Sequence, residues 1–247
     1  MANERFEESI KRLNDAIAAC DSIVFFGGAG VSTESGIPDF RSVDGLYNQK
    51  YKYPPETIIS HSFYMRNPSE FYRFYKDKML YLDAKPNVTH EKLAELEKMG
   101  KLKAVVTQNI DGLHQLAGSK EVLELHGSVH RNYCTRCRKF FDLKYIVQSE
   151  DVPICDACGG TVKPDVVLYE EGLDQDILSR TVARISQADM LIIGGTSLAV
   201  YPAAGLIDYF SGKYLVVVNM APTPRDQHAD ILVHGKLGEV FSKITIS

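Results

Sequence analysis

Apolar residues recur with a helical period near the start of the chain and in short continuous runs after it. Phe6, Ile10, Leu13 and Ile17 are three or four positions apart, the spacing of an amphipathic helix. The expected helices cover about residues 4–19, 69–83 and 89–99. The short apolar runs predict strands at about 22–26, 103–107, 122–125, 165–168, 190–193, 214–218 and 231–233. These runs are short and apolar, and several of them end in Gly, Thr or Asn. Continuous apolar runs of this kind are typical of parallel strands that are buried on both faces of the sheet.

Two interruptions divide this alternation of helices and strands. Residues 40–87 are irregular and rich in Tyr and Pro, and residues 126–161 contain four cysteines. We interpret both as insertions into one Rossmann-like α/β domain, which is expected to comprise residues 1–39, 88–125 and 162–247. The first insertion is expected to be helical.

Composition narrows the class of protein. The chain has 247 residues, of which 45% are hydrophobic and 24% charged, as in an ordinary soluble globular protein. A net charge of −4 gives no global electrostatic reason to bind nucleic acid or anionic lipid. No apolar run approaches the roughly 20 residues that span a bilayer, and the polar N-terminus shows no secretory signal. We therefore expect a cytoplasmic protein with no membrane partner and no nucleic-acid partner.

The cysteines indicate a metal site. Cys134 and Cys137 form one C-x-x-C pair, and Cys155 and Cys158 form a second pair 17 residues later. This spacing matches a four-thiolate zinc ribbon. We favour a zinc site over two disulfides because disulfides are rare in a reducing compartment. Four cysteine ligands leave no open position for water, so the zinc is expected to be structural. The fifth cysteine, Cys20, ends the first helix and is expected to be a buried small hydrophobe.

Polar, small or titratable residues follow five of the predicted strands. The sequence GGAGVSTESGIPDFRS follows the first strand, and the later strands lead into QNIDG, His126-Gly127, GGTS and Asn219. Ligands of open α/β sheets bind at the carboxyl ends of the strands. We therefore expect these residues to converge on one edge of the sheet.

Together, GAGVSTESGIPDFRS, TQNIDGLH, ELHGS, the two C-x-x-C pairs, GTSLAVYPA and VVN resemble the sirtuin family of NAD-dependent protein lysine deacylases, of bacterial or archaeal type. The matches run in the family's order from Gly28 to Asn219. The resemblance implies a large Rossmann domain and a small domain made of the zinc and helical insertions. NAD and an acyl-lysine peptide would meet in the cleft between them.

The glycine loop supports this resemblance from its own chemistry. Gly28 and Gly30 would let the backbone approach phosphate, to which Ser32 and Thr33 can donate. A dehydrogenase would instead continue into a helix and carry an acidic residue at the end of its second strand. Here the loop continues into GIPDFR, which could fold over the nicotinamide end. Such a loop suits a cofactor that is consumed as a co-substrate, because nicotinamide must be shielded from water and then released.

The resemblance implies a mechanism. The acyl oxygen attacks the ribose carbon as nicotinamide leaves, and His126 then acts as general base on a ribose hydroxyl. Asn109 is implied to position a water or the ribose. The acyl group is transferred to ADP-ribose. His90, His114 and His130 lack this context and receive no role.

The resemblance also implies contacts to the two substrates. Ile110 and Asp111 would contact the nicotinamide amide, Phe40 and Arg41 its ribose, and Gln108 a ribose hydroxyl. The other implied NAD contacts are Gly28, Ala29, Gly30, Thr33, Gly195, Thr196, Ser197, Asn219, Lys236 and Leu237. The backbone of Val167, Leu168 and Tyr169 would pair with the substrate peptide.

Two positions bear on substrate choice. The family pattern V-V-F-F-G-E reads here as VVLYEE, so that Glu170 replaces a glycine and could favour basic peptides or be merely solvated. Family members that remove succinyl or malonyl groups carry Tyr-x-x-Arg in the helix at 69–83, where this chain places Tyr75 and Lys78. Deacetylation is favoured as the main activity, with some tolerance for acidic acyl groups.

Two alternatives remain open at this point. A mono-ADP-ribosyltransferase would share every NAD residue and differ only in the acceptor. A zinc-ribbon interaction module is the second, since five basic residues surround the first cysteine pair: Arg131, Arg136, Arg138, Lys139 and Lys144.

Overall fold

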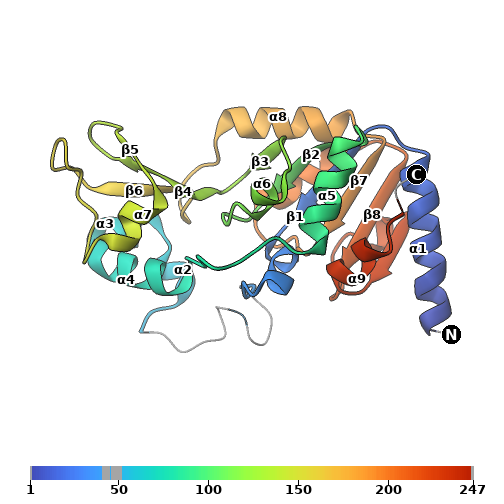
Figure 1. The fold of residues 1–247 in the computed structure, drawn as a ribbon, viewed down its shortest axis with the longest axis horizontal. Coiled ribbons are helices and arrows are strands. Elements are labelled where there is room, and N and C mark those ends of the chain that lie inside the picture. Colours follow the sequence, from blue (N-terminus) through green and yellow to red (C-terminus); the bar gives the residue numbers. More distant parts are fainter. Residues whose placement is uncertain (1, 41–44, 46–51, 246–247) are drawn as a thin grey trace.

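A six-stranded parallel sheet forms the larger of two lobes (Figure 1). The computed structural model describes residues 2–40, 45 and 52–245. The strand order is β3-β2-β1-β7-β8-β9, and all five neighbouring pairs are parallel. The strands are β1 (Ile23–Gly27), β2 (Leu102–Thr107), β3 (Val122–Glu124), β7 (Met190–Gly194), β8 (Tyr214–Asn219) and β9 (Ile231–His234). Chain order reverses between β1 and β7, the position at which a doubly wound sheet binds its ligand.

Helices cover both faces of this sheet. Along β1, Ile23 and Phe25 face one helical layer while Val24 and Phe26 face the other, and all four are fully buried. The first layer consists of α1 (Ala2–Ala18), α5 (Val88–Lys98) and α9 (Leu237–Ser242). The second contains α8 (Gln175–Ser186) and the 3-10 helix η4 (Ala203–Tyr209). The expected parallel α/β fold is confirmed by this arrangement.

The smaller lobe combines the two insertions around a single core. Phe71, Tyr72 and Tyr75 of the helical insertion pack with Phe141 and Ile146 of the cysteine insertion. The helical part consists of α2 (Pro55–Ile58), α3 (His61–Arg66) and α4 (Pro68–Lys78). The cysteine part contains β4 (Gly127–Cys134), β5 (Phe140–Phe141), α7 (Leu143–Gln148) and β6 (Val162–Val166), with antiparallel sheet order β5-β4-β6. Neither insertion therefore forms its core alone.

One expected strand belongs to the other sheet. The run at 165–168 was expected to be a parallel strand of the large sheet, but β6 pairs antiparallel with β4. Its residues alternate between buried and half-buried, as in a strand with one solvated face. The domain boundaries remain a prediction, and this pairing favours placing the start of the last Rossmann segment after β6.

The helical insertion also differs in detail from expectation. The helix expected over 69–83 ends at Lys78, and Met79, Tyr81 and Leu82 line the cleft between the lobes instead. Helices α2 and α3 were not expected. Within the described part of the chain, no helix is long and apolar enough to cross a bilayer.

Candidate active site

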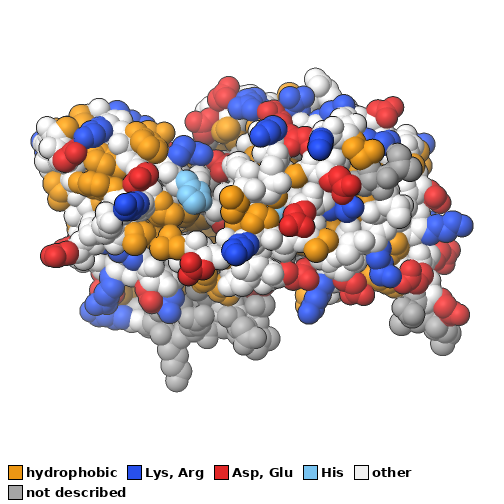
Figure 2. Space-filling view, viewed as in Figure 1, with side chains coloured by type: hydrophobic (Ala, Val, Ile, Leu, Met, Phe, Trp, Pro, Cys, Tyr) orange, Lys and Arg blue, Asp and Glu red, His pale blue; other side chains and the backbone are white. Residues whose placement is uncertain are grey.

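A cavity of about 1220 Å³ lies between the two lobes. Figure 2 shows the hollow between them, with a histidine side chain at its mouth. Its walls come from the carboxyl ends of β1, β2, β7 and β8, from α4, and from the segments before β4 and after β6. Every site residue expected to contact NAD or the peptide lines this cavity, except Arg41, which lies outside the described residues.

The glycine loop after β1 packs directly against the loop after β7. Gly30 N donates to Gly195 O over 2.8 Å, and Gly28 N donates to Gly194 O over 3.3 Å. A Cβ atom at Gly30 would lie only 2.8 Å from Gly195 Cα. Glycine is therefore needed here for contact between two loops as well as for access to a phosphate. Ala29, Thr196 and Ser197 line the cavity beside this contact.

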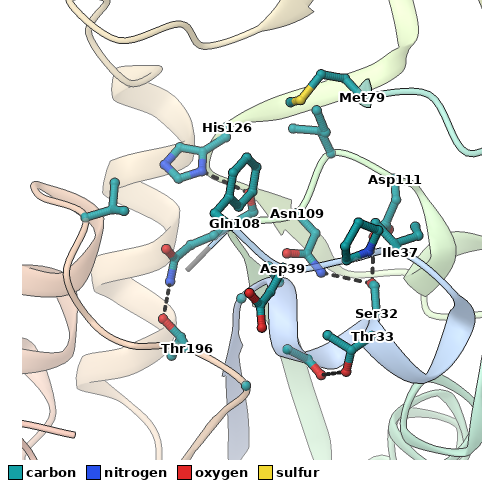
Figure 3. Close-up of a pocket in the computed structure, with 18 of the residues that line it drawn as sticks. Ser32, Thr33, Ile37, Asp39, Met79, Gln108, Asn109, Asp111, His126 and Thr196 are labelled. Atoms are coloured by element: carbon teal, nitrogen blue, oxygen red, sulfur yellow. Dashed lines mark hydrogen bonds between the residues drawn. The ribbon is translucent and has the colours of Figure 1, made fainter. Parts of the chain in front are cut away.

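Ser32 connects the glycine loop to the loop after β2 (Figure 3). Its hydroxyl donates to Asp111 Oδ2 over 2.6 Å and accepts from Asn109 Nδ2 over 3.1 Å. Ser32 is only 1% exposed but lines the cavity, and the expectation that it donates to phosphate stays a prediction. Its neighbour Thr33 is exposed, and its hydroxyl donates to Gly30 O. No local pattern predicts the Ser32 role, since its partners lie more than 70 positions away.

His126 is oriented by the carbonyl of Gln108 (Figure 3). Its Nδ1 lies 2.9 Å from that oxygen, and a carbonyl only accepts, so Nδ1 carries the proton and Nε2 is the basic nitrogen. Burial lowers the pKa of His126 below its usual value of 6.5, although the bond to Gln108 O opposes the shift. The Gln108 side chain donates to Thr196 Oγ1 over 3.1 Å and so joins the ends of β2 and β7.

Strand β4 of the small lobe holds the loop that carries Asn109, Ile110 and Asp111. Val129 N donates to Ile110 O, and His130 Nε2 lies 3.0 Å from Asp111 O. The sequence indicated no role for His130. Its bond is possible because Gly112, with φ of 74°, has no Cβ: such an atom would lie 2.7 Å from the His130 ring.

The far end of the cavity is formed by the ends of β8 and β9. Asn219 lines it, with its side chain donating to Ala221 O, and Lys236 and Leu237 line it at the start of α9. Glu34 of the glycine loop accepts from Gly238 N over 2.7 Å and ties that loop to α9. No local sequence pattern singles out Glu34, because its partner lies 204 positions away in the chain.

The described part of the GIPDFR segment borders the cavity. Ile37, Pro38, Asp39 and Phe40 all line it, and Asp39 is drawn with Gln108 and Asn109 in Figure 3. That this segment folds over the nicotinamide end stays a prediction.

The segment after β6 borders the opposite side. Val167 N donates to His126 O over 3.0 Å, so this segment directly adjoins the histidine. Tyr169 N donates to Ile59 O, and Leu168 is buried. All three residues line the cavity, which leaves room for a peptide beside them.

Tyr75 and Lys78 lie one turn apart on α4 and both line the cavity. Tyr75 is 1% exposed, and its hydroxyl has no hydrogen-bond partner among the described residues. Burial raises the pKa of Tyr75, so it stays neutral. Lys78 Nζ lies 3.1 Å from Asp77 Oδ2. The Asp77 carboxylate reduces the positive charge that Lys78 offers to the cavity.

The four paired cysteines form one cluster. Their sulfur atoms all lie within 4.8 Å of one another, with Cys134 and Cys158 3.4 Å apart and Cys137 and Cys155 3.6 Å apart. A tetrahedral zinc with bonds of about 2.3 Å requires sulfur separations of about 3.8 Å, so the cluster fits this ion. The backbone N–H of Cys137, with that of Arg136, lowers the pKa of Cys134 to about 6. The cluster is thus compatible with structural zinc.

Most of the basic residues near the first cysteine pair are engaged within the protein. Arg131 bridges Glu124 and Asp165, with distances of 2.6 and 2.8 Å. Lys139 pairs with Asp156, Arg136 donates to Cys158 O, and Arg138 lies over the Tyr133 ring. These contacts weaken the case for a nucleic-acid-binding ribbon.

Known proteins are similar to this chain in sequence and in structure. A curated protein from Clostridium acetobutylicum named NAD-dependent protein deacetylase is 58% identical over 240 residues, covering 96% of this chain and 98% of its own length. A protein of the same name from Clostridium perfringens is 58% identical over 241 residues, covering 96% of this chain and 99% of its own length.

Solved structures of Sir2 proteins are also similar to this chain. A complex described as Sir2, p53 peptide and NAD⁺ superposes with a TM-score of 0.85 at 41% identity, covering 95% of this chain and 96% of its own. Sir2 bound to acetylated peptide gives a TM-score of 0.85 at 40% identity, with the same coverage. Residues 28–202 match the sequence model of the Sir2 family. That match spans well over half of the 247 residues, and the chain belongs to the Sir2 family.

Proposed function

We propose that this protein is an NAD-dependent protein lysine deacetylase that transfers the acyl group of acyl-lysine to ADP-ribose and releases nicotinamide. The observation that carries the proposal is the position of His126. Its Nδ1 is held by Gln108 O, which leaves Nε2 as the base in a cavity bordered by the glycine loop and by Val167–Tyr169. The His126 imidazole therefore lies between the glycine loop, proposed to bind the nucleotide, and Val167–Tyr169, proposed as the edge that binds the peptide.

The nucleotide would lie along the large-lobe wall. The glycine loop and Thr196–Ser197 would approach its phosphates, and Asn219 with Lys236 and Leu237 would border the adenosine. At the nicotinamide end, Ile110 and Asp111 would contact the amide. Because Ser32, Val129 and His130 all fix this loop, it is ordered before the substrate arrives.

The acyl-lysine peptide would enter from the other side. A peptide lying along Val167–Tyr169 would bring the lysine side chain past Tyr75 toward His126. The acyl oxygen would attack the ribose carbon as nicotinamide leaves. His126 Nε2 would then accept the proton of a ribose hydroxyl, for which its lowered pKa keeps it unprotonated at neutral pH.

Zinc would be held by Cys134, Cys137, Cys155 and Cys158 and would act only on structure. The cluster contributes to the same core as Tyr72 and Tyr75. Reduced thiolates of this kind suit a reducing compartment, and we infer that the protein acts in the cytoplasm.

The test replaces His126 by Ala. We expect deacetylation of an acetyl-lysine peptide to fall by at least about a hundredfold, the lower end of the usual contribution of general-base catalysis. NAD affinity, measured by calorimetry, should change little. The matched control is His228→Ala, which removes an exposed histidine that does not line the cavity. Near wild-type turnover in His126→Ala would refute the assignment.

A further inference from the structure

Glu170 stands in an unusual backbone conformation at the peptide edge. Its φ is 76°, in the left-handed region that side chains other than glycine rarely adopt. We propose that Glu170 is a positioning residue: its carboxylate fastens the peptide edge to helix α3 and so sets affinity for the substrate peptide without contacting it. This inference rests on the proposed function of Val167–Tyr169 as that edge.

Both carboxylate oxygens of Glu170 are bonded to one residue of α3. Oε2 accepts from Ser62 N over 2.8 Å, and Oε1 accepts from Ser62 Oγ over 3.0 Å. Ser62 belongs to the first turn of α3, where backbone N–H groups lack partners within the helix. Hydrogen bonds of a charged carboxylate to such donors are stronger than bonds between neutral groups.

Contacts of the neighbouring residues also connect the peptide edge to α3 and to the residues just before it. Tyr169 N donates to Ile59 O over 3.1 Å, and His61 N donates to Tyr169 O over 2.9 Å. Glu171 adds a contact to His61 Nδ1 at 2.8 Å and accepts from Lys163 Nζ at 3.1 Å. The peptide edge is thus held to α3 by the backbone of Tyr169 and by the carboxylates of Glu170 and Glu171.

The local energetics favour this interpretation. A left-handed conformation is strained for a residue with a side chain, whereas glycine adopts it freely. Glycine at position 170 would relieve that strain but would have no carboxylate for Ser62. The two bonds to Ser62 offset the strain, and their effect is to fix the edge where Leu168 and Tyr169 line the cavity.

Direct selection of basic peptides by Glu170 is the competing role, because Glu170 is exposed and lines the cavity. The bonds to Ser62 use two of the roughly four acceptor positions of the carboxylate, so a substrate cation could still pair with it. The two roles differ in what they predict for Ser62, which helps to fix the edge but carries no charge.

The experiment compares Glu170→Gly, Ser62→Ala and the double variant. Glu170→Gly suits the backbone conformation, so it should fold. We expect both single variants to raise KM for an acetyl-lysine peptide, by about three- to tenfold for Glu170→Gly and less for Ser62→Ala, which keeps the backbone donor. We expect kcat and KM for NAD to stay near wild type. The double variant should be no worse than Glu170→Gly, because both changes remove parts of one interaction. Glu150→Gly, which removes an exposed carboxylate of the same lobe, is the matched control.

A second readout is independent of activity. Hydrogen exchange at the Tyr169 amide of the substrate-free protein should be faster in Glu170→Gly and in Ser62→Ala than in wild type. Unchanged exchange and unchanged KM in Glu170→Gly would overturn the proposal. So would a rise in KM confined to peptides with basic flanks and absent from Ser62→Ala. If wild type failed to deacetylate any peptide, the proposed function would fail. The exchange measurement would still test whether Glu170 and Ser62 hold the peptide edge against α3.

Discussion

The Nε2 atom of His126 is the one basic nitrogen that the proposed chemistry requires. Its availability depends on a single bond, from Nδ1 to Gln108 O, and Gln108 is itself held by Thr196. Histidine at a strand end is often only a satisfied core residue. Here its backbone carbonyl also accepts from Val167 N, which places the peptide edge beside it. Three chain segments therefore meet at the residue proposed as the base.

This geometry predicts a pH profile. His126 must be unprotonated to act as base, and burial lowers its pKa below 6.5. Activity should therefore rise with pH along an acid limb whose midpoint lies below 6.5, and it should be level at neutral pH. The measurement is kcat/KM for peptide between pH 5 and 8, which reports groups of the free enzyme. A midpoint at or above 7 would contradict the assignment.

A second buried histidine predicts an effect on stability. His114 is 1% exposed, and neither ring nitrogen has a partner among the described residues. Burial, with the neighbouring His90, lowers its pKa to about 3. The unfolded chain binds this proton below pH 6.5 while the folded chain does not. The free energy of unfolding should therefore fall by up to about 1.4 kcal/mol for each unit that the pH decreases from 6.5 to about 3 on account of this group.

His114→Leu tests this effect. The variant removes two unpaired nitrogens, so at pH 7 its stability should lie within about 1 kcal/mol of wild type. At pH 5 its free energy of unfolding should exceed that of wild type. Urea unfolding at both pH values measures this difference. If the free energy of unfolding changed equally with pH in the two proteins, His114 would have no effect on the pH dependence of stability.

At the scale of elements, the buried parallel strands were predictable and the partner of β6 was not. Runs such as MLIIG and the LVVV of β8 are continuously apolar, because helices cover both faces of the sheet. Strand β6 reads VKPDV, and its alternation with Pro164 in the middle is typical of a sheet edge with one solvated face. That pattern gives the type of strand but not its partner, β4, which begins the same cysteine insertion about 30 residues earlier in the chain.

The helical insertion shows the same limit. Pro55 and Pro68 begin α2 and α4, the first helical position that proline favours, so helix starts were present in the sequence. The helices are short, and packing against the cysteine insertion stabilises them. For the site, the strand ends predicted which residues gather, whereas Ser32, Glu34 and His130 act through partners far away in sequence.

Helix α4 carries the prediction on acyl choice. Tyr75 and Lys78 share its cavity-facing side, and a lysine offers a positive charge without the bidentate fork of arginine. Deacetylation should be the main activity. Lys78→Ala should lower desuccinylation several-fold and leave deacetylation within about twofold of wild type. Lys85→Ala, an exposed lysine outside the cavity, is the control. Measurable desuccinylation that Lys78→Ala leaves unchanged would exclude Lys78 from acyl selection.

At the scale of the whole molecule, each lobe supplies one wall of the cleft. The parallel sheet provides the nucleotide wall, and the small lobe provides α4 and the strand β4 that holds the Asn109–Asp111 loop. The cysteine cluster and the aromatic residues of α4 share one core. A metal bound by this cluster would therefore stabilise the lobe that carries α4 and β4.

Loss of zinc should accordingly unfold the small lobe and leave the sheet folded. We expect Cys155→Ser to lose the metal, because metal affinity and folding free energy are coupled in such clusters. Deacetylation should be lost, and amide exchange should accelerate in α4 and β4 but not in β1 or β7. Zinc content and exchange are measured on the same sample. The control is Cys20→Ala, which should keep its zinc; an active, zinc-free Cys155→Ser would disprove the coupling.

The central claim is that nicotinamide release from NAD depends on an acyl-lysine acceptor. Its most direct test measures nicotinamide and deacetylated peptide in one reaction, with labelled NAD to detect any transfer to protein. We predict one nicotinamide per lysine deacetylated, no release without peptide, and no label on protein. Release accompanied by labelled protein would indicate ADP-ribosyl transfer instead, and no release under any condition would contradict the enzymatic account altogether.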